Sequence, residues 1–534
     1  MNRGLVAALA LFAVLGCSPK EVRYNVNIVT KVCDPTVDPF KNVGFLKVRI
    51  LGPDITKPIE SVAPTGQAAH TIKIPEIPAG KQRVIEVRGY DMDPRSGGTV
   101  QSMGRSVPFD VPDVIVQGMN DAPVDVTVFL RKIGVLTPTS SATDPTTCGQ
   151  MKIPRAGHSA TVLKNGSVFV AGGWNFIPGQ AIKEALFDTE IYDPSTGVFE
   201  SAHEISIANG LQRLPRAFMG STLLPSGQVL FWGGESYSGN INNVVSPSAI
   251  ILIYDDIENN FGPLPQRSSP PNIARTGASL AIDANGKVLV VGGKTRDLSN
   301  GNLVLVPDVE WFDPTNNATA VIGGVSLPRD GASVLSVQNG TFIAVAGGAD
   351  GSTMQNDVSF FQWDGNANQF SQHSLTNPPK LGSPGRRAAA AATINATNDI
   401  VLAGGYSDPL MVAPVSTSEI VGTQSDTVTP GATVGSRGEA CAVSLSNGDV
   451  FVGGGRSVDN GNMPQSVDST VIIHSDATGA TEPLGGPTLN KPRYQHTCTL
   501  LRDGSVLVTG GVDEESGVFT ILQDAWIYQP PPVD

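Results

Sequence analysis

The sequence predicts an all-β protein in which a small β-sandwich precedes a seven-bladed β-propeller. The composition is the first reason, because 59 glycines and 40 prolines accompany only 16% charged residues, which favours many short strands joined by turns. The other two reasons are short runs of alternating apolar and polar residues near the N-terminus and a sevenfold repeat in the rest of the chain. A chain of 534 residues, 40% of them hydrophobic, is also long enough for more than one core.

The net charge excludes one class of partner. The formal charge is -13 at pH 7, so the surface should repel phosphate backbones. Nucleic acid is therefore not expected as a partner.

The N-terminus predicts a secreted, lipid-anchored protein. Residues 1–16 contain one positive charge at Arg3, an apolar run over residues 5–14 and small residues before Cys17, which is the layout of a signal peptide. The apolar run is too short to span a bilayer as a permanent helix. The small residues and the cysteine resemble the bacterial lipobox. This resemblance implies lipidation of Cys17, a tether over residues 17–23 and, because a serine follows the cysteine, sorting to the outer membrane. An ordinary secretory signal with an incidental cysteine is the alternative.

Residues 24–134 predict a β-sandwich. Alternation of apolar and polar residues is clear in residues 44–51 and 83–90, and prolines and glycines interrupt such runs at intervals typical of a sandwich. An immunoglobulin-like or transthyretin-like sandwich fits this pattern. Residues 137–147 are rich in Thr, Ser, Pro and Asp and show no period, which predicts a linker over residues 135–149.

A repeat runs through residues 150–534. Each copy has an arginine, a glycine eleven positions later and a glycine pair six positions after that. Five copies keep this spacing, and they begin at Arg155, Arg216, Arg275, Arg437 and Arg493. Two near matches begin at Arg329, with one extra residue before the pair, and at Arg387, where Asn398 replaces the middle glycine. The glycine pairs, which we expect to be structural, are Gly172 and Gly173, Gly233 and Gly234, Gly292 and Gly293, Gly347 and Gly348, Gly404 and Gly405, Gly454 and Gly455, and Gly510 and Gly511.

Each copy predicts four antiparallel strands. The residues after the arginine form a first strand, a turn such as Asn165-Gly166 supplies the positive backbone angles of a tight hairpin, and a second strand ends at the glycine pair. A third strand ends in an aromatic residue and an aspartate, as in Tyr192-Asp193, and turns into a fourth. Four such strands form one propeller blade. The last copy stops before its fourth strand, and we expect residues 148–153 to supply it and remove an exposed sheet edge.

These features resemble the Kelch repeat. The shared pattern is a leading Pro-Arg, as at Pro154-Arg155, then the double glycine, then an aromatic residue followed by Asp and Pro. The resemblance covers about residues 150 to 530 and implies a Kelch-type propeller. The family includes galactose oxidase, whose copper site needs Tyr, His and a Tyr–Cys crosslink. That set cannot be assigned in this sequence, so neither a cofactor nor a metal site is expected.

Four cysteines follow Cys17, namely Cys33, Cys148, Cys441 and Cys498. Outside the cytoplasm four cysteines allow three pairings. We favour Cys33 with Cys148, because this pair would join the two ends of the N-terminal region. None of the four has the sequence spacing of a metal site.

The predicted topology gives the ring two different rims. The turns between first and second strands and between third and fourth strands are tight, whereas the loops between second and third strands are long and irregular. Loops on a rigid scaffold often carry recognition, so we expect a binding face on the long-loop rim. Its candidate residues are Trp174, Asn175, Phe176, Tyr237, Arg296, Asp297, Tyr406, Asp408, Arg456 and Asp513. The alternative is that the loops only cap the barrel and the aromatic side chains pack on it.

The sequence offers no catalytic constellation. His158 and His496 both follow the repeat arginine by three residues, which indicates blade packing. We therefore predict a lipid-anchored protein of the bacterial cell envelope whose propeller binds a protein or a glycan, rather than an enzyme. One alternative is a carbohydrate-active or oxidative enzyme that uses Asp297, Asp408 or Asp513 on the long-loop rim. The other is a purely structural envelope component.

Overall fold

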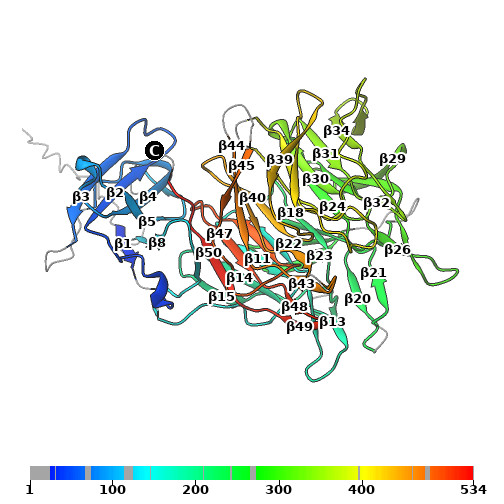
Figure 1. Ribbon diagram of the computed structural model, residues 1–534, viewed down its shortest axis with the longest axis horizontal. Coiled ribbons are helices and arrows are strands. Elements are labelled where there is room, and N and C mark those ends of the chain that lie inside the picture. The colour runs from blue at the N-terminus through cyan, green and yellow to red at the C-terminus, as the bar shows by residue number, and fades with distance from the viewer. Residues whose placement is uncertain are drawn as a thin grey trace, which may run out of the picture.

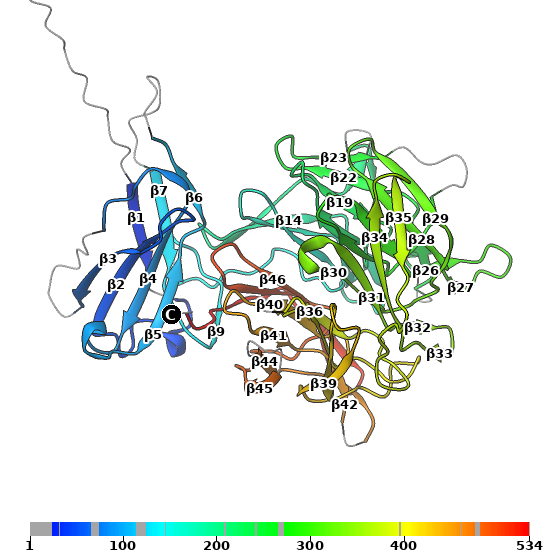
Figure 2. The same ribbon diagram turned by 90° about the horizontal axis from the view of Figure 1, so that it is seen from above.

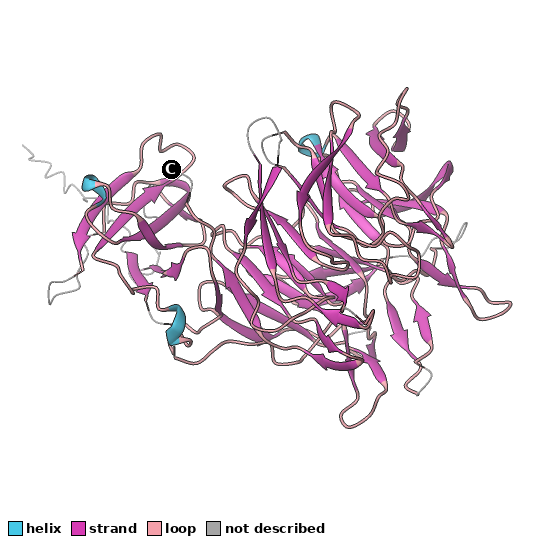
Figure 3. Ribbon diagram, in the orientation of Figure 1, coloured by secondary structure: helices cyan, strands magenta, loops and turns pink. Residues whose placement is uncertain are grey.

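The computed structural model describes residues 24–30, 32–65, 74–113, 124–144, 146–207, 210–240, 243–264, 272–394, 397–459, 461–475 and 481–532. These residues form strands and no α-helix (Figure 3), which confirms the all-β prediction. They include three short 3-10 helices, η1 (Pro35–Val37), η2 (Pro94–Ser96) and η3 (Gln338–Gly340). Among them no helix has the length and apolarity needed to cross a membrane. The predicted signal peptide and tether, with Cys17, lie outside the described residues.

The N-terminal domain is a two-sheet sandwich (Figure 1). One sheet has the order β3-β2-β4-β5-β8, with β6 paired to β4, and the other pairs β1 with β7 in parallel. Alternation places Val48 and Ile50 of one sheet and Val128 of the other in a fully buried core. The strands are β1 (Tyr24–Val29), β2 (Phe45–Leu51), β3 (Ile59–Pro64), β4 (Gly80–Tyr90), β5 (Val100–Arg105), β6 (Phe109–Val111), β7 (Val124–Phe129) and β8 (Arg131–Lys132).

The rest of the described chain forms seven successive four-stranded antiparallel sheets of the blade type. The first strands of neighbouring sheets contact each other in order, and the last, β46, contacts the first, β10, so the sheets close into a ring. The sheets are β10 (Ser159–Val162), β11 (Val168–Ala171), β14 (Thr189–Asp193) and β15 (Val198–Ser201); β18 (Gly220–Leu223), β19 (Val229–Trp232), β22 (Leu252–Asp255) and β23 (Asn260–Pro263); β24 (Ser279–Ile282), β25 (Val288–Val291), β28 (Asp308–Asp313) and β29 (Ala318–Ser326); β30 (Ser333–Val337), β31 (Phe342–Ala346), β34 (Val358–Asp364) and β35 (Gln369–His373); β36 (Ala390–Thr393), β37 (Ile400–Ala403), β38 (Thr417–Val421) and β39 (Val428–Thr433); β40 (Cys441–Ser444), β41 (Val450–Gly453), β44 (Thr470–Ser475) and β45 (Thr481–Gly485); and β46 (Thr497–Leu500), β47 (Val506–Thr509), β50 (Ala525–Tyr528) and β9 (Leu136–Pro138).

The glycine pairs join each blade to the next. The second glycine donates its N–H to the carbonyl of the next blade's repeat arginine, as from Gly173 to Arg216 (2.8 Å), and the ring closes from Gly511 to Arg155 (2.9 Å). The first glycine has no room for a side chain, because a Cβ on Gly172 would lie 2.2 Å from the Arg216 carbonyl oxygen. Both glycines of the pair also have positive φ. The predicted structural role of these glycines therefore has a steric cause.

The repeat arginines are buried and bind across their own blade. Arg155 donates to the carbonyl of Gly172 (2.7 Å) and to the Glu190 carboxylate (2.7 Å), and both charged side chains are almost fully excluded from solvent. Arg216 has carbonyl acceptors at Gly233 and Ile250, and burial lowers its pKa to about 10. Such a buried charge requires hydrogen-bond acceptors, and the carbonyl of the first glycine of the pair is one of them.

The fifth blade corrects the predicted repeat. Its repeat arginine is Arg386 and not Arg387, because Arg386 accepts the N–H of Gly348 at its carbonyl (2.7 Å) and donates to the carbonyl of Gly404 (2.8 Å). This copy has one extra residue between its arginine and its glycine pair, and it lacks the middle glycine. The arginine at the expected spacing from the pair is therefore Arg387, one position after the true repeat arginine. Arg387 is thereby free for a different role at the rim of the ring.

The closing strand is also different from the prediction. β9 pairs with β50, with Tyr528 opposite Leu136 and Trp526 opposite Pro138, so residues 148–153 are not the fourth strand of the last blade. The segment that contains Leu136 forms the fourth strand because the Leu136 side chain is buried among the apolar residues of the last two blades. Residues 148–153 instead lie beside the segment just before β50, where Gln150 forms a single bridge with Asp524. The predicted linker over residues 135–149 thus contains a strand of the ring.

The sandwich lies against the tight-turn rim of the ring (Figure 1, Figure 2). Gly134 donates to the Gln529 carbonyl (2.8 Å), and a Cβ on Gly166, in the first blade's tight turn, would lie 2.9 Å from Val107 of the sandwich. The disulfide between Cys33 and Cys148 confirms the favoured pairing and ties the sandwich to the segment that enters the ring. One rim of the ring is therefore partly covered by the molecule itself.

Candidate functional site

The opposite rim carries a set of β-hairpins, which we call the crown. The loops between second and third strands were expected to be irregular, but most of them form hairpins because their ends are already paired at the glycine pair. Figure 1 shows β20 and β21 extending from the ring on this side. The crown consists of β12 (Trp174–Phe176) with β13 (Lys183–Ala185), β20 (Glu235–Tyr237) with β21 (Val245–Pro247), β26 (Lys294–Arg296) with β27 (Leu303–Leu305), β32 (Ala349–Asp350) with β33 (Thr353–Met354), β42 (Arg456–Val458) with β43 (Pro464–Ser466), β48 (Val512–Glu515) with β49 (Val518–Ile521), and the loop of residues 406–414.

A ring of paired residues, the mouth ring, forms the base of the crown. In every blade the residue directly after the glycine pair forms an antiparallel bridge with the residue directly after the repeat arginine. The pairs are Trp174 with Ala156, Glu235 with Ala217, Lys294 with Thr276, Ala349 with Asp330, Tyr406 with Arg387, Arg456 with Gly438, and Val512 with Tyr494. The repeat thus places seven unlike pairs of side chains around one axis.

Two of the predicted binding residues are buried in the mouth ring. Trp174 is 3% exposed and donates its indole N–H to Gln495 (3.2 Å), while the Lys183 ammonium lies 4.1 Å from its ring centre. Tyr406 is 1% exposed and donates its hydroxyl to Glu439 (3.4 Å). Both side chains therefore pack on the barrel, as in the alternative to ligand contact.

Two carboxylates, the buried Glu235 of the mouth ring and the half-buried Glu439 beside it, accept hydrogen bonds from neighbouring blades. Glu439 accepts from the Gln495 amide (3.0 Å), and Glu235 accepts from the Thr276 hydroxyl (2.5 Å). Burial raises the pKa of both carboxyls, and the ammonium of Lys183 is close enough to both to interact with each charge. The central network is thus polar but internally satisfied, which favours a rigid base for the crown.

The remaining predicted residues have local roles. Asn175, Phe176 and Tyr237 are half-buried on their hairpins, and Arg296 donates to the Val245 carbonyl of the adjacent hairpin. Arg456 donates to the Glu514 carboxylate (2.7 Å) of the next blade.

Two of the three aspartates considered for catalysis bind within their own turns. Asp297 accepts from the N–H of Ser299 (2.8 Å) and Asp408 from the N–H of Leu410 (2.8 Å), so each holds its own turn. Asp513 is half-buried, and burial raises its pKa.

A pocket of about 370 Å³ opens in the crown between the third, fourth and fifth blades. Its polar wall is an ion cluster in which Asp330 binds both Lys294 (2.5 Å) and Arg387. Its apolar wall is β27, where Leu303 is 39% and Val304 40% exposed. The nearby loop adds two further exposed apolar side chains, Leu410 at 79% and Val412 at 61%. A pocket with a charged wall and an apolar edge is typical of a recognition site.

Sequence reasoning missed most of the residues that form this site. Lys294 and Arg387 lie at the two mouth-ring positions, directly after a glycine pair and directly after a repeat arginine. Those positions were readable from the repeat, and comparing them between copies would have identified them. The exposed leucine and valine of β27 gave no such signal.

The comparisons with known proteins agree with this geometry. A Kelch motif matches residues 154–202, which contain the whole first blade. The ring is a Kelch-type β-propeller. No curated protein sequence matches the chain.

The chain matches the solved structure of a fungal oxidase and, more weakly, a second solved structure. A fungal alcohol oxidase of the AA5 family, in complex with copper, shares 19% identity over 72% of this chain and 76% of that chain, with a TM-score of 0.51. The structure of YjhT shares 14% identity over 63% of this chain and 99% of that chain, with a TM-score of 0.44. At such low identity the likeness to the oxidase shows the fold alone.

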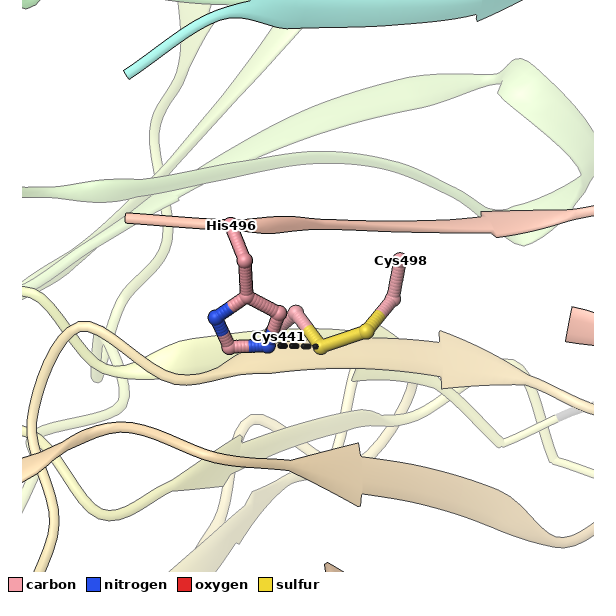
Figure 4. A group of neighbouring side chains, drawn as sticks. All are labelled: Cys441, His496 and Cys498. Atoms are coloured by element: carbon pink, nitrogen blue, oxygen red, sulfur yellow. Dashed lines mark hydrogen bonds between the residues drawn. A yellow bond between two sulfur atoms is a disulfide. The ribbon is translucent and has the colours of Figure 1, made fainter. Parts of the chain in front are cut away.

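The inner strands of the Kelch propeller hold a second feature. His158 packs between the first and last blades, with its Nε2 3.1 Å from Thr497 Oγ1 and 3.2 Å from Thr509 Oγ1. His496 has the equivalent place one blade earlier, but its Nε2 lies 3.1 Å from Cys441 Sγ (Figure 4). Burial lowers the pKa of both histidines to about 3, so both are neutral at pH 7.

A disulfide joins Cys441 to Cys498 beside this second histidine. Among the described residues, Cys441, His496 and Cys498 are the group with ligand atoms close enough to hold a metal ion. The sequence prediction rested only on the spacing of the cysteines along the chain, so it could not detect this group. Sequence spacing suggested no group because Cys441 comes from a different blade.

Proposed function

We propose that this protein is a lipid-anchored protein of the bacterial envelope whose Kelch propeller binds a protein ligand at the crown. The observation that carries the proposal is the difference between the rims: the sandwich covers part of the tight-turn rim, whereas the crown holds the pocket at Asp330. A rigid ring that presents varied hairpins on one side has the organisation of a binding module.

A protein segment fits the pocket better than a glycan. The exposed large side chains on the hairpin and the loop that contribute to the pocket are aliphatic, including Leu298 at 96% and Leu410 at 79%. Sugar rings usually stack on exposed aromatic side chains, and the three aromatic residues of the mouth ring, Trp174, Tyr406 and Tyr494, are buried. An extended segment with an apolar side chain beside a polar or charged group would match both walls of the pocket.

Photo-crosslinking in cells tests the binding face. A crosslinking amino acid replaces Leu298 in the crown or, as a matched control, Ile257 in a tight turn, because both side chains are 96% exposed on opposite rims. We expect a discrete protein adduct from position 298 only, and its loss in a chain that also carries Leu303→Asp and Val304→Asp. Equal adducts from both positions would refute the crown as the binding face. Binding on a glycan array that survives both aspartates would favour the glycan alternative.

Lipidation is tested separately. Metabolic labelling with an alkyne-tagged fatty acid should mark the wild-type chain and leave the Cys17→Ser chain unlabelled and released from membranes. Labelling of the Cys17→Ser chain would contradict the proposed anchor.

The copper chemistry of the AA5 oxidase does not transfer to this chain. Galactose oxidase, a member of the family that the repeat resembles, has a copper site that needs Tyr, His and a Tyr–Cys crosslink. In this chain the two cysteines near His496 are bonded to each other. The residues present therefore do not fit that copper site, and we propose no oxidative step.

A further inference from the structure

The group Cys441, His496 and Cys498 lies where two blades meet. Cys441 belongs to β40 and Cys498 to β46, the neighbouring first strands of the last two blades, and His496 directly precedes β46. The two Sγ atoms and a ring nitrogen of His496 all lie within 4.8 Å of one another. Figure 4 shows the imidazole of His496 pointing toward the sulfur of Cys441, which is bonded to that of Cys498.

The histidine of this group lacks the partners that its equivalent has. His496 is only 8% exposed, and within the described residues its Nδ1, like that of His158, has no hydrogen-bond partner, so the two histidines differ at Nε2. Its Nε2 has a sulfur neighbour in Cys441, whereas Nε2 of His158 has two threonine hydroxyls. A disulfide sulfur is a weak hydrogen-bond acceptor, so Nε2 of His496 gains little stabilisation from its contact with Cys441.

We propose that reduction of the disulfide between Cys441 and Cys498 converts this group into a Zn²⁺ site with two thiolate ligands and Nε2 of His496. Two thiolates and one imidazole are ligands that Zn²⁺ accepts, with Zn–S distances of about 2.3 Å and Zn–N distances of about 2.0 Å. A fourth position would stay open for water, as in three-ligand zinc sites. After reduction the two Sγ atoms must move apart to bind one ion, and the three ligand atoms already lie within 4.8 Å of one another.

The chemistry balances with an external thiol. A dithiol reductant reduces the disulfide to two cysteine thiols and is itself oxidised to its own disulfide. Zn²⁺ then displaces one proton from each thiol as the two Zn–S bonds form. Both cysteines are half-buried, so a small reductant can reach the sulfur pair.

The two states are mutually exclusive ways to join the same strands. The disulfide links β40 and β46 covalently, and the ion would link them through coordination. The blades therefore stay connected in either redox state, and only the reduced state adds an open metal position on the wall of the ring.

Cobalt titration tests the proposal, with Co²⁺ as the coloured probe for the Zn²⁺ position. The chain of residues 18–534 is reduced with dithiothreitol, freed of reductant without air, and titrated with Co²⁺ and then Zn²⁺. We expect one Co²⁺ per chain with thiolate charge-transfer absorption, full displacement by Zn²⁺, and no such absorption in the oxidised chain. The oxidised chain is a control that needs no substitution.

Four variants separate this site from other thiols. The Cys441→Ser/Cys498→Ser chain should lose the absorption, whereas the Cys33→Ser/Cys148→Ser chain should keep it. His496→Asn should weaken Co²⁺ binding at least about tenfold, and His158→Asn should leave it unchanged. Absence of binding by the reduced wild-type chain, or binding that survives loss of Cys441 and Cys498, would overturn the proposal.

Discussion

The inner ring and the crown of the propeller follow opposite rules. The inner ring consists of the repeat arginines and the glycine pairs. It is nearly the same in all seven blades, because each blade forms the same hydrogen bond with the next. The crown starts one residue later and differs in every blade. This difference teaches that residues kept the same in every copy, here the arginines and glycines, are those that close the ring. Positions that differ from copy to copy form the surface that is available for recognition.

The largest effect should come from the inner ring. Gly172→Val would place a branched side chain 2.2 Å from the Arg216 carbonyl at a residue with φ of +61°. We expect a loss of more than about 4 kcal/mol in the free energy of unfolding, or failure to fold. Denaturant unfolding measures it. Gly239→Val, at a hairpin tip with open space around it, is the control, and an equal loss there would remove the distinction.

Breaking one buried ion pair should cost somewhat less. Glu190→Ala leaves Arg155 buried without its carboxylate, which we expect to lower the free energy of unfolding by about 3 kcal/mol. Glu200→Ala changes an exposed side chain of the same blade and should stay within about 0.5 kcal/mol of the wild-type chain. Thermal unfolding of the three proteins checks the order, and equal stability would refute the role of the pair.

The buried histidines should make the inner ring sensitive to acid. Their pKa values fall from 6.5 to about 3 on folding, so the unfolded chain binds more protons between these values and stability falls as the pH falls from 6.5 toward 3. Between pH 7 and pH 5 each histidine should contribute about 2 kcal/mol of this loss. His158→Asn, which removes the group that interacts with Arg155 and His496, should flatten the curve of unfolding free energy against pH. An unchanged slope would contradict the assignment.

The smallest effect on stability should come from the crown. Leu298→Asp changes a side chain that is 96% exposed, so the free energy of unfolding should change by less than about 0.5 kcal/mol. Ligand capture should fall strongly in the same variant, if the crown is the binding face. Chemical unfolding and pull-down of the same preparation give both values. A large loss of stability would mean that the Leu298 side chain supports the fold, contrary to its assignment to the binding face.

The sequence carried more information about the ring than about the crown. The arginine and glycine spacing predicted the blades because both residue types answer a backbone requirement that recurs in each copy. It misassigned Arg387 because an extra residue in that copy hid Arg386 one position earlier. It also placed the closing strand at residues 148–153, because only packing of Leu136 against the last blades selects residues 136–138.

The crown was harder to predict because its contacts cross between blades. Asp330 of the fourth blade binds Lys294 of the third and Arg387 of the fifth. Among the inner strands, Cys441 and His496 likewise come from different blades. No spacing within one copy encodes such contacts. The buried state of Trp174 and Tyr406 likewise depends on neighbours that are far away in the sequence.

The closing strand sets the order in which the molecule can be completed. Thr137 of β9 donates its hydroxyl to the carbonyl of Ile527, 390 positions later. At a synthesis rate of about 5 to 20 residues per second, the first strand of this pair waits roughly 20 to 80 s for its partner to emerge. The sandwich can mature during that interval, but the last blade cannot. Any chain that ends before β50 therefore leaves β9 without the partner strand that closes the ring.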